Sequence, residues 1–431
     1  MPHQTSSFNL KVVIQETGLN ADTLRAWERR YGLPNPERTP GGHRLYSLRD
    51  IQMLNWFLAR QKEGLSISRA VELWRNLEAD GQDPLPAYTP QKLQVEPGGT
   101  VLDDLCHAWV NACLAFEEQA AERILSQAFS ILAPEMVCTG VLQNGLALIG
   151  RDWYSGKASV QQEHFASALA MRRLHSLYSA APLPNRPGRI LAACPPGEDH
   201  EFGLLLLTVL LRRRGWDVVY LGANVPVQRL ESALHAVNPF LVISLAQTLP
   251  AAASLRLMGE FLTSQGVRMA FGGGIINSLP STQEAIPGYF LGVDLAASAQ
   301  IVESLWNLKP HAPPVSPLPP GYSQALQHYI ELYPLINIFV THEIPTSEIS
   351  PVHMEIALTS LQKHLQAALE LGDIHFVVES LGWLEQLLVN HGLPKDLLQH
   401  FLLVYWQALE THLPGADQGI FSGLFDTLRN N

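Results

Sequence analysis

The sequence predicts a multidomain protein built from α-helical and α/β domains. Its 431 residues are more than one ordinary domain accommodates, so two to four domains are expected. Two stretches are typical of linkers: residues 78–99, which lack apolar periodicity and carry four prolines, and the proline-rich residues 309–321. They separate an N-terminal segment, residues 1–77, from a central region and from a C-terminal helical module, residues 322–431.

Composition narrows the class of protein. The chain is 47% hydrophobic and 16% charged, as globular domains are, and its first residues, MPHQTSSFNLK, show no signal-peptide pattern. The apolar run that ends at Arg212 is too short to span a bilayer. The four cysteines form no CxxC pair, so neither a disulfide framework nor a zinc site is expected. We expect a cytoplasmic protein without a membrane partner.

Charge is unevenly distributed along the chain. Residues 1–77 hold 11 Lys/Arg and 7 Asp/Glu, a net charge of +4, whereas the remainder holds 18 and 33, a net charge of −15. A basic segment on an acidic body indicates that only the N-terminal segment meets a polyanion.

The N-terminal segment carries a DNA-binding pattern. KVVIQETG and ADTLRAWERRYG predict two short helices, with Asn20 as N-cap of the second, and the glycine pair in NPERTPGGHRLYS suits the turn of a small hairpin. The string TLRAWERRYGLPNPERTPGGHRLYSLRDIQML resembles the winged helix-turn-helix of the MerR family. The resemblance implies a dimer or higher oligomer on two-fold operator DNA, with helix 21–31 in the major groove and wing 38–46 on the backbone. The residues expected to face DNA are Arg25, Arg29, Arg30, Tyr31, Arg38, His43, Arg44 and Tyr46.

The central region divides into a helical part and an alternating part. Within residues 100–182, four runs place apolar residues at helical spacing, which predicts a four-helix bundle. Within residues 188–308, short apolar strands such as RILAAC and FLVISL alternate with helices, which predicts a Rossmann-like parallel sheet covered on both faces. Ligands of such sheets bind at the carboxyl ends of the strands, and the loop PPGEDHEFG follows the first strand.

The loop and two later positions form a recognisable set. Glu198-x-His200-x-x-Gly203, followed by Ser244 and then by Gly272-Gly273, resembles the cobalamin-binding fold of methionine synthase and the B12-dependent mutases. The resemblance implies that His200 is the lower axial ligand of cobalt and that Glu198 holds its other ring nitrogen. Glu198 replaces the more usual Asp, and Leu-Ala after Ser244 departs from the usual S-x-L. A dinucleotide site is not expected, because GxGxxG is absent.

The bundle adds a second motif, Trp153-x9-Glu163-His164. Together with the domain order, it resembles the helical cap of the light-sensing MerR-type cobalamin regulators (CarA/CarH/LitR type). The resemblance implies that Trp153, Glu163 and His164 lie over the upper face of adenosylcobalamin. The family usually has a histidine after the tryptophan, where this chain has Tyr154.

These resemblances imply a B12-dependent photoreceptor that regulates transcription and is not an enzyme. Light-driven cleavage of the cobalt–carbon bond would change its oligomeric state and its operator binding. One alternative is a corrinoid methyl-transfer protein, which would need a partner for both methyl donor and acceptor. Another is a regulator that senses cobalamin or a bilin without light.

The C-terminal module, residues 322–431, lies outside both resemblances. It holds eight of the 16 histidines, and its helices carry aromatic residues such as Trp383, Tyr405 and Trp406. An oligomerisation or partner-binding unit is the simpler hypothesis. The alternative is a second sensory pocket with a non-covalent bilin, since no cysteine follows Cys194.

Overall fold

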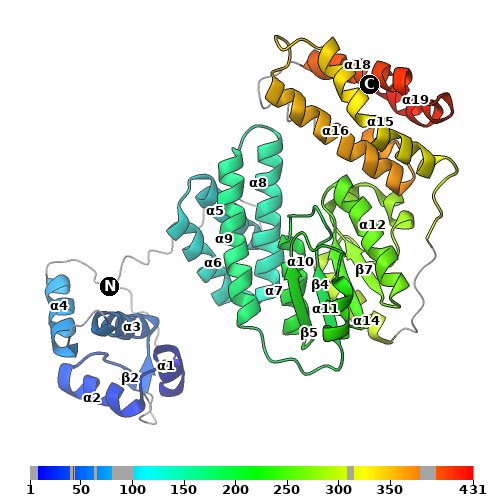
Figure 1. Ribbon diagram of the computed structural model, residues 1–431. Coiled ribbons are helices and arrows are strands. Elements are labelled where there is room, and N and C mark those ends of the chain that lie inside the picture. Colours follow the sequence, from blue (N-terminus) through cyan, green and yellow to red (C-terminus); the bar gives the residue numbers. More distant parts are fainter. Residues whose placement is uncertain are drawn as a thin grey trace. The chain divides into compact units, whose positions relative to one another are not determined.

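The computed structural model describes residues 8–38, 42, 44–62, 66–79, 101–307, 315–378 and 395–430 (Figure 1). The chain divides into two compact units, Met1–Gln94 and Val95–Asn431. The first is small and mainly helical. The second contains a helical bundle, a parallel sheet and a set of C-terminal helices.

The first unit is a winged helix-turn-helix. Its strands β1, β2 and β3 form an antiparallel sheet in the order β1-β3-β2. Its aromatic core contains Trp27, Phe57 and Trp74, whose rings meet edge to face. The elements are β1 Phe8–Asn9, α1 Leu10–Thr17, α2 Ala21–Tyr31, β2 Glu37–Arg38, β3 Arg44–Tyr46, α3 Leu48–Lys62 and α4 Ile67–Ala79.

The turn between α1 and α2 is set by two residues. Gly18 ends α1 in the left-handed conformation, with φ of 69°, which a residue without a β-carbon adopts at little cost. Asn20 caps α2, and its side-chain oxygen accepts a hydrogen bond from Thr23 N at 2.7 Å. Helix α2 therefore begins at Ala21, where the sequence predicts it to begin.

The second unit begins with the expected four-helix bundle. Its third run is continuous from Pro134 to Tyr154 and contains a π-helical segment in its middle. Gly140 and Gly145 allow close packing there: a β-carbon would lie 2.3 Å from Leu102 Cδ2 at the first position and 2.6 Å from Trp109 Cε3 at the second. The elements are α5 Val101–Leu114, α6 Glu118–Ile131, α7 Pro134–Val137, the π segment Cys138–Gln143, α8 Asn144–Tyr154 and α9 Val160–Ser179.

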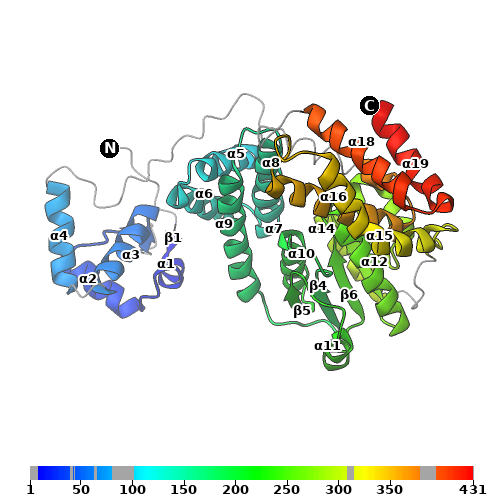
Figure 2. The ribbon, with the colours of Figure 1, turned by 45° about the horizontal axis from the view of Figure 1, so that its top comes forward.

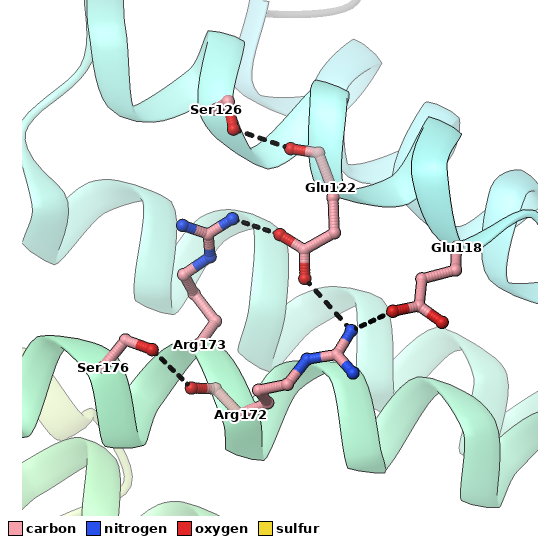
Figure 3. A network of polar contacts seen from close by, with 6 residues as sticks. All are labelled: Glu118, Glu122, Ser126, Arg172, Arg173 and Ser176. Carbon is pink, nitrogen blue, oxygen red and sulfur yellow. Dashed lines mark hydrogen bonds and ion pairs between the residues drawn. The ribbon is translucent and has the colours of Figure 1, made fainter. Parts of the chain in front are cut away.

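An ion-pair network joins α6 to α9 in this bundle (Figure 3). Arg172 Nη2 lies 2.6 Å from Glu118 Oε1 and 3.4 Å from Glu122 Oε1, and Arg173 also pairs with Glu122. Because the side chains of Arg172 and Glu118 are about half exposed, water weakens their pairing. The Arg172–Glu118 pair therefore contributes little to stability.

The α/β part is a parallel sheet in the strand order β5-β4-β6-β7-β8. The chain reverses direction across the sheet between β4 and β6, and such a switch point opens a crevice at the carboxyl ends of those strands. The strands are β4 Arg189–Ala193, β5 Asp217–Gly222, β6 Leu241–Leu245, β7 Met269–Gly272 and β8 Tyr289–Phe290. The helices are α10 Phe202–Arg213, α11 Leu230–Val237, α12 Leu249–Ser264, α13 Gly274–Ser278 and α14 Leu295–Asn307, with a 3₁₀ turn at Pro280–Ala285.

Helix α10 explains the apolar run LLLLTVLL. All eight residues from Leu204 to Leu211 are buried, because the helix contacts the sheet, α14 and the bundle helix α9. Two arginines at its end complete the joint with the bundle: the guanidinium of Arg212 lies 3.9 Å from the Tyr178 ring centroid, and Arg213 Nε lies 2.6 Å from Glu135 Oε1. The bundle is thereby held against the sheet.

The C-terminal helices share a hydrophobic core with the sheet. Figures 1 and 2 show α15 and α16 next to α12. Helix α16 packs on α12, which explains why α12 is apolar on more than one face. Within these helices the hydroxyls of Tyr329 and Tyr405 meet at 2.7 Å in the core. Trp383, which is expected on a helix of this module, lies outside the described residues. The helices are α15 Tyr322–Glu343, α16 Pro351–Leu371, α18 Lys395–His412 and α19 Gly415–Asn430.

Candidate functional site

The expected cofactor residues gather at the carboxyl ends of three neighbouring strands. The loop with Glu198 and His200 follows β4, Ser244 lies near the end of β6, and Gly272-Gly273 follow at the end of β7. Because β4 and β6 flank the switch point, these residues surround the crevice that this topology opens.

Glu198 and His200 form a directed pair. Glu198 Oε1 accepts hydrogen bonds from His200 Nδ1 at 2.7 Å and from the His200 backbone nitrogen at 2.8 Å. The Glu198 side chain is 1% exposed, whereas that of His200 is 68% exposed. The hydrogen bond to Glu198 raises the pKa of His200 above its ordinary value, although burial acts in the opposite direction. Since Nδ1 is occupied, a metal would be bound through Nε2.

The second oxygen of Glu198 is held from β6. Glu198 Oε2 accepts a hydrogen bond from the backbone nitrogen of Gln247 at 2.5 Å, and the Glu198 backbone oxygen accepts one from Asn224 N at 2.9 Å. Gln247 Oε1 in turn accepts from Gly274 N at 2.9 Å. Sequence reasoning missed both Gln247 and Asn224. The contacts to Glu198 are made by their backbone nitrogens, so residue type gives no signal for them.

Ser244 offers an unused polar group near the carboxyl end of β6. It is 1% exposed, and among the described residues its Oγ has no hydrogen-bond partner. A buried hydroxyl is normally paired, so an absent polar group is the simplest partner. Ser244 thus fits a ligand whose polar group reaches the carboxyl end of β6.

Two glycines allow a close backbone approach at this end of the sheet. Gly273 has φ of 123°, and a β-carbon there would lie 2.0 Å from the Ala246 backbone oxygen. Next to it, Gly272 has no heavy atom within 4 Å of the position of a β-carbon, so a ligand could pack against its backbone. Gly203, the last residue of the loop motif, would place a β-carbon 3.4 Å from Leu245 Cδ2. The chemistry and spacing of these residues fit the expected cobalamin.

The bundle contributes Glu163 to the same region. Its carboxylate adds to the raised pKa of His200, so the first turn of α9 lies within electrostatic reach of the loop. Glu163 Oε2 accepts from His164 Nδ1 at 2.8 Å, and Glu163 Oε1 accepts from the Ser167 hydroxyl at 2.6 Å. Trp153 is half-buried near the end of α8, and Tyr154 after it is exposed.

The N-terminal unit presents arginines along α2. Arg25, Arg29 and Arg30 are exposed, as is Arg38 on β2. Tyr31 takes part in holding α4, because its hydroxyl lies 2.9 Å from Ser68 Oγ and its backbone oxygen accepts from Arg75 at 2.5 Å. His43 lies outside the described residues.

Two wing residues turn inward instead. Glu28 on α2 accepts hydrogen bonds from Arg44 Nε at 2.9 Å and from the Tyr46 hydroxyl at 2.5 Å. Tyr46 is fully buried, so the expectation that its side chain faces DNA is wrong. Burial and the bond to Glu28 raise the pKa of Tyr46. Arg44 and Tyr46 both attach the wing to α2 through Glu28. The residue types alone do not predict this role, because an aromatic or basic residue in a hairpin can equally face DNA.

Among the described helices, none combines the length and apolar character needed to cross a bilayer.

Comparison with known families matches three parts of the chain. Residues 8–77 match the MerR HTH family regulatory protein family. Residues 105–178 and residues 188–299 each match a family described as B12 binding domain. The C-terminal helices lie beyond these matches, and the expectation of a bilin there gains no support.

Individual relatives cover the same region. The chain is 31% identical to the HTH-type transcriptional repressor CarA of Myxococcus xanthus over 307 residues, which is 70% of this chain and 96% of that protein. It is 34% identical to the repressor CarH of the same organism over 54% of this chain and 76% of that protein. Among solved structures, the monomethylamine corrinoid protein of Methanosarcina barkeri aligns with a TM-score of 0.38 at 18% identity, over 47% of this chain and 97% of that one.

Proposed function

The chain belongs to the family of B12-binding, MerR-type transcriptional regulators that includes CarA and CarH, and we propose that it is a light receptor of that family. In this proposal the dark form binds adenosylcobalamin between bundle and sheet and holds operator DNA. Light then loosens the assembly and releases the DNA. The Glu198–His200 pair carries the proposal, because it presents one oriented imidazole at the crevice of the sheet.

The cofactor would be bound by residues of the α/β part on one side and of the helical bundle on the other. His200 would ligate the cobalt through Nε2, and Glu198 would keep Nδ1 protonated and the ring oriented. Ser244 would pair with the nucleotide tail, and Gly272 would leave room for it, whereas Gly273 lets the chain pass close to the Ala246 backbone. Bound adenosylcobalamin would supply a weak cobalt–carbon bond that visible light breaks.

The bundle would contribute further residues to the cofactor site. Trp153 and Glu163 would contact the adenosyl group, and His164 would hold Glu163 from the side. Helix α9 runs from Glu163 at its first turn to Tyr178 against Arg212 at its end. A shift of Glu163 would therefore move α9 and change its contact with α10, where the bundle meets the sheet. This contact is the element that must adopt two arrangements in our proposal.

DNA binding would use the exposed arginines. Arg25, Arg29 and Arg30 on α2 would enter the major groove, and Arg38 would lie along phosphates. A two-fold operator requires at least a dimer, and a tetramer would engage two such sites.

A single preparation tests the proposal. The full-length protein is loaded with adenosylcobalamin in the dark, and its absorption spectrum, its mass in solution and its affinity for operator fragments selected from random DNA are measured before and after illumination. We expect the spectrum, the oligomer and the DNA affinity to change together in the wild type. Cobalamin binding with identical dark and light behaviour would exclude light sensing and leave the light-independent alternative.

A further inference from the structure

A hydrogen bond on β5 involves the residue that directly follows His200. This residue, Glu201, is the N-cap of α10, yet its carboxylate makes no hydrogen bond to the first turn of that helix. Instead, Glu201 Oε2 accepts a hydrogen bond from the Tyr220 hydroxyl on β5 at 2.8 Å. The side chain at an N-cap commonly bonds its own helix, whereas this one holds a neighbouring strand.

Strand β5 is adapted to this contact. Its pairing with β4 shifts by one residue between Tyr220 and Gly222, as at a β-bulge, and bulges re-aim the side chains beside them. Gly222 has φ of 85°, and a β-carbon there would lie 3.0 Å from Glu201 Oε2. A larger residue at position 222 would therefore press on the carboxylate that Tyr220 holds.

The ring of Tyr220 reaches the helical bundle. Its centroid lies 6.0 Å from that of Tyr178, in the last turn of α9, which runs beside α10 (Figure 1). Arg212 on α10 also holds Tyr178, because its guanidinium lies 3.9 Å from the ring centroid and its Nη1 donates to the Tyr178 backbone oxygen at 3.5 Å. The end of α9 is thus attached to both β5 and α10.

We propose that Tyr220 is a positioning residue that couples the loop of His200 to helix α9. Its hydroxyl holds Glu201 and its ring packs against Tyr178. The inference rests on the proposed cobalamin site and adds a second connection to the bundle, at the end of α9 opposite to Glu163. A cofactor that orders the loop of His200 would thereby also order the last turn of α9.

The hydroxyl and the ring of Tyr220 have separate tasks. Burial and the neighbouring Glu201 raise the pKa of Tyr220, so the hydroxyl stays protonated at neutral pH and donates its hydrogen bond. A hydrogen bond to a charged group contributes more than one between neutral groups. Tyr220→Phe therefore removes the bond to Glu201 and leaves the ring against Tyr178.

Hydrogen exchange in the dark tests the coupling. Exchange is followed by mass spectrometry of the full-length protein, on peptides from the last turns of α9, with and without adenosylcobalamin. We expect the cofactor to slow this exchange in the wild type, and the slowing to be about tenfold smaller in Tyr220→Phe, as loss of one hydrogen bond to a charged group predicts. Both proteins should show the spectrum of histidine-ligated cofactor, because the substitution leaves the Glu198–His200 pair intact.

The matched control is Tyr322→Phe on α15, which also removes a hydroxyl with one hydrogen bond, from Ile374 N at 3.3 Å. Equal slowing in the wild type and Tyr220→Phe, the same loss in Tyr322→Phe, or no slowing in the wild type with cofactor bound would overturn the inference. A wild type that binds no cobalamin would refute the proposed function and this inference together. A wild type that binds it and ignores light would refute light sensing alone.

Two changes at Glu201 test the same bond from its other end. Glu201→Ala removes the acceptor and should reduce the slowing as Tyr220→Phe does, and the double variant should lose little more, because each single change already breaks the bond. Glu201→Gln keeps an acceptor oxygen and should retain most of the slowing. If Tyr220→Phe does not fold, the Ala and Gln variants decide, and equal slowing in these two variants would refute the coupling.

Discussion

Replacing Glu198 by Gln is the most direct test of the cofactor site. The carboxylate is buried and accepts three hydrogen bonds, from His200 Nδ1, from the His200 backbone nitrogen and from the Gln247 backbone nitrogen. A glutamine has one acceptor oxygen and an amide group that can only donate, so at least one of these N–H groups would face another donor. The substitution also removes the negative charge that makes His200 more basic.

The expected loss of cofactor affinity in Glu198→Gln follows from the role of Glu198 as the group that orients His200. Loss of the group that orients a metal-binding histidine typically lowers metal affinity by 10- to 100-fold, which corresponds to about 1.4 to 2.7 kcal/mol. We expect Glu198→Gln to bind adenosylcobalamin within that range of weakening, and His200→Ala to lose imidazole ligation altogether. The folded state should persist, because the rest of the β4 loop is held by backbone bonds such as Cys194 N to Gly222 O at 2.9 Å.

The assay is a titration in the dark, followed by absorption, in which the histidine-ligated cofactor is distinguished from the free form. Asp199→Asn is the matched control, since it changes the same charge one residue away on an exposed side chain. Wild-type affinity and an unchanged histidine-ligated spectrum in Glu198→Gln would refute the reasoning. Equal losses in both variants would show that only the net charge of the loop matters.

Four further predictions follow. Arg25→Ala should weaken operator binding and lower the slope of log affinity against log salt by about one, because it removes one positive charge at the DNA, as measured by anisotropy over a salt series. In the protein without cofactor, NMR should show that His200 has a pKa above its ordinary value, and Glu198→Gln should lower that pKa. The protonated pair then stabilises the folded state at low pH, and this stabilisation is lost as the pH rises through the raised pKa of His200. Gly273→Ala should lower the melting temperature and cofactor affinity, because its β-carbon would lie 2.0 Å from a backbone oxygen. Tyr154→His should add a second imidazole ligand in the illuminated state, which the wild-type spectrum should lack, because a phenol is a poorer ligand for cobalt than an imidazole.

The fold could be predicted from the sequence where burial imposes a pattern. RILAAC and FLVISL are continuous apolar runs, as strands covered on both faces require, and they form β4 and β6. Asn20 and Gly18 mark the turn between α1 and α2 by chemistry that depends on the residue itself. The packing of α16 on α12 could not be predicted, because an apolar helix does not specify its neighbour.

The candidate site divides in the same way. Glu198 and His200 are recognisable because their side chains perform the chemistry and their spacing fits one loop. The role of Tyr46 was missed because its environment decides it: the same residue on an exposed edge of the wing could contact a phosphate, whereas here it is buried against Glu28.

Gln247 shows why such a site cannot be read completely from side chains. Its backbone nitrogen is the third donor to Glu198, a contact that every residue except proline can make. Its side chain meanwhile bonds Gly274 N, which ties the end of β6 to the glycine segment after β7. One residue thus joins the support of His200 to the glycine segment after β7. Because Gln247 bonds Glu198 through its backbone, a side-chain substitution at position 247 would first remove the hydrogen bond from Gly274 N. Such a substitution would affect His200 only if the loop moved.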